Sequence, residues 1–88
     1  MHAALMAFAP ALAQQMRARM PRLLFTIVSA TTGWQLYEGG HGRSWHRNLG
    51  EARQNAKLIA ATLHEHHGIP TAVILGLDCD SVLLAQHG

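Results

Sequence analysis

The feature that most constrains this chain is that its last two predicted strands are apolar on both faces. Residues 71–77 and 81–86 carry apolar side chains at consecutive positions and not at alternate ones, which is typical of strands covered on both faces. Only one helix is predicted in the same module, between residues 48 and 68. Because a single helix covers one face of a sheet, we expect the other face to meet either the N-terminal segment or a second copy of the chain.

Composition supports one small folded domain. The chain has 88 residues, 49% of them hydrophobic and 14% charged, against about 25% charged in ordinary globular proteins. Such a chain is too apolar to be intrinsically disordered. A chain of this length buries a modest share of its surface, so a partner surface would add to its stability. The net charge of +2 excludes a dense basic field of the kind that follows nucleic-acid phosphates.

The first two strands are predicted to form a hairpin. Residues 23–29 are rich in β-branched and aromatic side chains, and residues 34–38 alternate apolar and polar after a turn that ends at Gly33. The next segment, residues 39–47, contains three glycines and is expected to be a flexible loop. Trp45 lies within it, and its large apolar area predicts that it pins the loop to the core.

A helix is predicted between Asn48 and Gly68. Asn48 is a good N-cap with Glu51 three residues later, while Gly68 and Pro70 end the helix. One stripe of the helix is apolar and partly made of alanine, which permits close approach to a sheet. This stripe consists of Ala52, Ala56, Ile59 and Leu63, flanked by Leu49 and Ala60.

The predicted order is therefore ββαββ, an α+β fold with one helix packed on a small antiparallel sheet over residues 21–88. Residues 1–20 form an N-terminal extension that is either helical or disordered, with apolar residues at helical spacing. These are Leu5, Phe8, Leu12, Met16 and Met20. No Lys or Arg precedes Arg17, which argues against a secretory signal. No run approaches the roughly 18 apolar residues of a membrane span, so we expect no membrane association.

The pattern over residues 23–85 resembles a small bacterial module, domain-of-unknown-function family 2188. The matching residues are Gly33-Trp34, Ser44, Glu51-Ala52 with Ala56 and Ala60, Gly68, Val73-Ile74, and Gly76 with Asp78. The chain departs from the family pattern at Cys79, where a glycine is expected, and in lacking a surface rich in Lys and Arg. The resemblance implies the fold and no particular activity.

One group of residues could bind nucleic acid, because it places cations beside an aromatic stacking surface. The group consists of Arg43, Trp45, His46, Arg47, Arg53 and Lys57. Four cations provide only a modest counterion-release contribution, so this interpretation predicts a weak nucleic-acid-binding domain. The alternative interpretation is a solvated helix face beside an anchoring tryptophan.

Histidine and cysteine give little indication of chemistry. His64 and His67 share a helix face and could both reach one Zn²⁺ or Ni²⁺, but a structural zinc site needs four ligands. Histidines in a last helical turn are also favoured by the helix dipole. Cys79 lies between Asp78 and Asp80, and neighbouring carboxylates disfavour the reactive thiolate. A single cysteine makes no internal disulfide, which favours a cytoplasmic protein.

No acid and base pair suggests an enzyme, and no cofactor motif is present in the sequence. We therefore expect a non-enzymatic interaction module that assembles as a homodimer and could bind another protein. The alternative is the weak nucleic-acid-binding domain described above.

Overall fold

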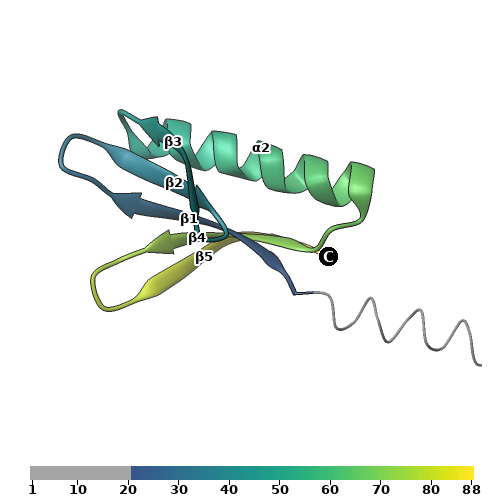
Figure 1. Cartoon of the computed structure of the whole chain (residues 1–88). Helices are drawn as coiled ribbons and strands as arrows, with labels where there is room; N and C mark the ends of the chain where they lie inside the picture. The colour runs from purple at the N-terminus through teal and green to yellow at the C-terminus, as the bar shows by residue number, and fades with distance from the viewer. Residues whose placement is uncertain (1–20) are drawn as a thin grey trace, which may run out of the picture.

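Six elements follow one another along residues 21–88, the part of the chain that the computed structural model describes. They are β1 (Leu23–Ser29), β2 (Trp34–Glu38), β3 (His41–His46), α2 (Leu49–His67), β4 (Thr71–Gly76) and β5 (Ser81–His87). The predicted N-terminal extension, residues 1–20, lies outside the described residues. The strands form one sheet in the order β3-β2-β1-β4-β5, and α2 lies along one of its faces (Figure 1). The α+β class and the single helix packed on a sheet are confirmed.

The sheet is mixed and not wholly antiparallel as predicted. β1 pairs with β4 in parallel, whereas the other three pairs are antiparallel. The cause is the helical connection. A helix of 19 residues is about 28 Å long, so it returns the chain to the end of the sheet where β1 begins. β4 therefore starts beside the first residue of β1, with Leu23 opposite Thr71.

Residues 39–47 were predicted to be a flexible loop, and this prediction is wrong for most of the segment. Residues 41–46 form the edge strand β3, which pairs antiparallel with β2. Glu38 and His41 face each other across a two-residue turn, and Gly39 has φ 61°, the positive value that the first central position of a type II′ hairpin turn requires. Pairing with β2 gives the segment its strand geometry although it contains no β-branched residue.

Both edge strands contain one extra residue. Register along β2 and β3 shifts so that Arg43 has no opposite residue, and register along β4 and β5 shifts so that Leu84 has none. Such bulges bend an edge strand and increase its twist. They also determine which side chains of β3 and β5 point toward the helix.

The two predicted ends of the helix are confirmed. The Asn48 side chain accepts a hydrogen bond of 2.9 Å from the Glu51 amide, and Gly68 adopts a left-handed conformation with φ 67°. The Gly68 and Ile69 amides donate to the carbonyls of His64 and Leu63, which satisfies two free carbonyl groups at the helix end.

The core lies between α2 and the sheet. Three alanines on the helix, Ala52, Ala56 and Ala60, are fully buried, which allows close contact with the strands below them. The large buried side chains come from the central strands and are Phe25, Ile27, Leu36 and Val73. The buried Thr71 hydroxyl donates a hydrogen bond of 3.0 Å to the carbonyl of Ala60, which links the first residue of β4 to the helix.

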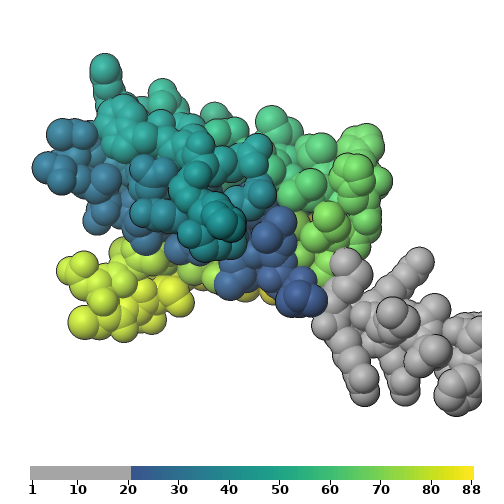
Figure 2. Space-filling model, in the orientation of Figure 1, coloured from purple at the N-terminus to yellow at the C-terminus, as the bar shows by residue number. Residues whose placement is uncertain are grey.

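Arg22 joins the first and last strands. Its guanidinium donates to the backbone oxygens of Thr71, His87 and Gly88 at 3.0, 3.1 and 2.7 Å. The planar fork of arginine suits several acceptors at once. At the opposite end of the sheet, the tip of the β4–β5 hairpin diverges from the β1–β2 turn (Figure 2), although β4 stays paired with β1 along its length.

Candidate functional site

The sheet face away from α2 is the most extensive candidate site, and we call it the open face. Its side chains follow from register, because opposite residues in neighbouring strands point to the same side. One row across the sheet consists of Trp45, Gln35, Val28, Gly76 and Ser81. The next row consists of Gly42, Tyr37, Thr26, Ile74 and Leu83. The third row is shorter and consists of Leu24, Ala72 and Gln86.

No residue in these three rows is charged. Several are large apolar residues that remain accessible to solvent: Leu24 is 39% exposed, Trp45 46% and Leu83 57%. Leu77 and Val82 in the β4–β5 hairpin are exposed as well. Among residues 21–88 no second layer packs against the open face, whereas α2 covers the other side. An apolar patch of this kind is typical of a protein interaction surface.

Trp45 does not pin a loop to the core as the sequence suggested. The residue opposite Trp45 is Gln35, on the open face, while the neighbouring Ser44 and His46 point to the helix side. The indole instead lies against Gly33: a Cβ at position 33 would be 2.5 Å from Cζ2 of the ring. The absence of a side chain at Gly33 therefore allows the indole to lie directly on the turn between β1 and β2.

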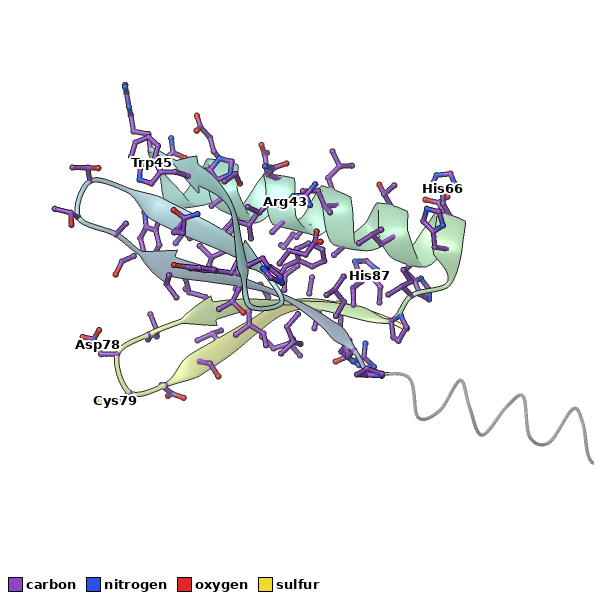
Figure 3. All side chains as sticks on the ribbon, in the orientation of Figure 1. Arg43, Trp45, His66, Asp78, Cys79 and His87 are labelled. Carbon is purple, nitrogen blue, oxygen red and sulfur yellow. The ribbon has the colours of Figure 1, made fainter. Side chains whose placement is uncertain are left out.

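The residues predicted to bind nucleic acid do not come together on one surface. Arg43 forms an ion pair with Glu38, and both side chains are partly exposed. His46 points to the helix, where its Nε2 lies 2.8 Å from the Ser44 hydroxyl and 3.3 Å from the Asn55 side chain. Trp45 is on the opposite face of the sheet. Figure 3 shows Arg43 and Trp45 at separate places along β3.

Arg53 and Lys57 lie on the far side of the helix from this strand. Each is two residues from Asn55, which places it about 160° around a helix that turns about 100° per residue. With Gly50 and Gln54 they line a surface depression of about 240 Å³. All four residues belong to one helix, so the depression lies between neighbouring side chains. Arg47 is exposed in the connection between β3 and α2.

One histidine at the helix end, His64, packs with the last strand. The rings of His64 and His87 are stacked with centroids 6.2 Å apart, and Figure 3 shows His66 and His87 at this end of the molecule. His67 is exposed at the last helical position. Within residues 21–88, no three potential ligands lie close enough together to hold a metal ion.

Cys79 is exposed at the tip of the β4–β5 hairpin, with Asp78 beside it (Figure 3). The Asp80 side chain accepts a hydrogen bond of 2.8 Å from the Ser81 amide, which is the turn-forming role expected of an aspartate. Leu77 and Asp80 close the turn through their backbone groups.

The sequence indicated that one sheet face needs cover, but it did not identify the residues on that face. Leu24 and Leu83 were not singled out because each lies in a run of apolar residues with no alternation to show which side chains point inward. A one-residue change in register turns every side chain to the opposite face. The bulge at Leu84 changes the register in this way within β5.

Over residues 21–88, α2 lacks the apolar length that crossing a bilayer requires. No family model matches the chain, and no curated protein or solved structure shows significant similarity to it. The resemblance to family 2188 therefore stays a prediction.

Proposed function

We propose that this protein is a non-enzymatic interaction module that assembles with a second copy of itself through the open face. The observation that supports the proposal is the uncharged open face with its three exposed apolar anchors, Leu24, Trp45 and Leu83. Burying apolar surface contributes about 25 cal/mol per Å², so covering this face stabilises the assembly.

A second copy is a suitable occupant because the face is compatible with itself. In a twofold symmetric dimer the same patch of both copies forms the interface, and a charged residue on the patch tends to lie close to a residue of like charge. All ten charged residues within 21–88 lie outside the three rows: Arg22, Glu38, Arg43, Arg47, Glu51, Arg53, Lys57, Glu65, Asp78 and Asp80. Two open faces can therefore meet without repulsion between like charges. Two sheets packed in this way lie about 10 Å apart, as in β-sandwiches.

The test compares two lysine substitutions of similar exposure on opposite sides of the molecule. Leu83→Lys places a charge on the open face, where the leucine is 57% exposed, and Leu58→Lys places one on the outer side of α2, where the leucine is 67% exposed. Neither leucine belongs to the fully buried core, so both variants should remain folded. Sedimentation velocity over a range of concentrations measures the dimer dissociation constant of each.

We expect Leu83→Lys to weaken dimerisation by about 30-fold or more, because a lysine at the interface would be buried without a partner. Leu58→Lys should dimerise like the wild type. If both variants dimerise equally well, the open face is not the interface. If the wild type itself is monomeric across the range, the self-assembly proposal is wrong.

A further inference from the structure

We infer that Trp45 of each copy docks on Gly76 and Ser81 of the other copy, through a twofold axis that runs parallel to the strands. This inference rests on the proposed function, since it specifies how two open faces meet. It assigns Trp45 the role of anchor and the end of the β4–β5 hairpin the role of receiving surface.

Side-chain size changes from one end to the other of the first row of the open face. The row begins with the largest side chain, Trp45 on the edge strand β3, and ends with two of the smallest residues, Gly76 on β4 and Ser81 on the edge strand β5. A Cβ at Gly76 would already lie 3.0 Å from Cγ1 of Val28 in the same row, so any side chain at this position requires Val28 to move. Along this row the β3 end is bulky and the β5 end is small, whereas along the second row the order is reversed, from Gly42 on β3 to Leu83 on β5.

The position of β1 in the sheet determines how two open faces can overlap. β1 is the middle strand of β3-β2-β1-β4-β5. A twofold axis parallel to the strands and passing over β1 therefore places β3 of one copy over β5 of the other, and does so twice. The rotation keeps each row at the same position along the strands. Trp45 of one copy therefore faces Gly76 and Ser81 of the other copy.

The alternative twofold axis runs across the strands and places β3 over β3. Centred on the second row, the middle one of the three, this arrangement opposes Leu83 to Leu83 at one edge and Gly42 to Gly42 at the other, which separates the sheets unevenly. Protein interiors tolerate few voids, and large residues pack best against small ones across an interface. The bulky-on-small arrangement keeps the two sheets at a constant separation.

Trp45 already contacts the turn between β1 and β2 before any partner binds. Its indole lies against Gly33, where no side chain separates the ring from the backbone. Fixing a side chain in advance lowers the entropic cost of binding. Tryptophan is also among the residues that most often dominate the energy of protein interfaces.

The experiment uses the full-length chain with the substitution Trp45→p-benzoylphenylalanine, which retains an aromatic ring and forms a covalent bond to nearby groups on irradiation. Light scattering first establishes whether this variant is a dimer. Irradiation of the dimer is followed by proteolysis and mass spectrometry, which locate the attachment site. We expect a covalent dimer with attachment to residues 74–83 of the second copy.

Attachment to residues 41–47 of the second copy would overturn the inference in favour of the axis across the strands. Attachment to residues 1–20 of the same chain would overturn it by showing that the N-terminal segment covers Trp45. A monomeric wild type would instead contradict the proposed function, so the two failures are distinguishable.

A second substitution tests the receiving surface. Ser81→Arg places bulk and charge where the indole is expected to dock, and Ser81→Ala is the matched control. Ser81 is exposed and its only hydrogen bond to a side chain comes from its backbone amide, so neither change should unfold the strand. We expect Ser81→Arg to weaken dimerisation about tenfold or more and Ser81→Ala to leave it unchanged. Equal dimerisation of the two variants would contradict the inference.

Discussion

The indole of Trp45 packs directly against the backbone of Gly33. A Cβ at position 33 would lie 2.5 and 2.7 Å from Cζ2 and Cε2 of the ring and would also approach the carbonyl of His46. Gly33→Ala should therefore destabilise the protein by about 1–3 kcal/mol, the usual cost of overpacking. Urea unfolding measures the loss.

Gly40→Ala is the control for this substitution, because a Cβ there meets nothing within 4 Å. It should change the free energy of unfolding by less than about 0.5 kcal/mol. In a Trp45→Ala background the cost of Gly33→Ala should become smaller, since the ring is gone, but the His46 carbonyl remains close. Equal costs in the two backgrounds would show that the clash with the His46 carbonyl, the atom nearest to the added Cβ, and not the clash with the ring, determines the cost.

Thr71→Val tests the hydrogen bond that links β4 to the helix. The Thr71 hydroxyl is buried and donates to the Ala60 carbonyl at 3.0 Å. Valine preserves the shape and removes the donor, so we expect a loss of about 0.5–1.5 kcal/mol. Thr62→Val is the comparison, because the Thr62 hydroxyl makes a similar bond to Leu58 on the exposed side of the helix. Thermal unfolding should show a larger decrease in Tm for Thr71→Val than for Thr62→Val.

Arg22→Met tests the connection between the first and last strands. The substitution keeps much of the aliphatic length but removes three hydrogen bonds to backbone oxygens. These bonds are partly exposed, so we expect a loss of about 1–2 kcal/mol. Native-state hydrogen exchange should show faster exchange at the C-terminal end of β5. Arg47→Met, at an exposed connection, should leave β5 unchanged; a similar effect of both substitutions would show that general charge loss is responsible.

Zinc should not stabilise the protein through residues 21–88. His64 is stacked on His87, and no group of three potential ligands occurs in the described part of the chain. Adding an equimolar amount of Zn²⁺ to a metal-stripped sample should leave Tm unchanged. A rise in Tm that disappears in the His64→Ala variant would instead identify a metal site at the helix end.

The features that the sequence predicted correctly depend on local interactions. The helix caps at Asn48 and Gly68 involve contacts between residues only a few positions apart, and strand β1 has the β-branched and aromatic residues that favour extended structure. Strand β3 was missed because its residues, His-Gly-Arg-Ser-Trp-His, have little strand propensity. Its structure comes from pairing with β2.

The orientation of Trp45 could not be predicted for a related reason. Whether Trp45 points to the helix or to the open face depends on its register with Gln35 and on the extra residue Arg43 two positions earlier. Register and bulges are set by pairing between strands and leave no mark in a single sequence. The same dependence on strand pairing explains why the six candidate nucleic-acid-binding residues lie on different surfaces although they are close in sequence.

The most direct test of the account is the solution mass of the wild-type chain, measured by multi-angle light scattering over a wide concentration range. Self-assembly through the open face predicts a mass twice the 9.6 kDa of one chain, decreasing toward one chain only on dilution. A mass of one chain at every concentration would contradict it.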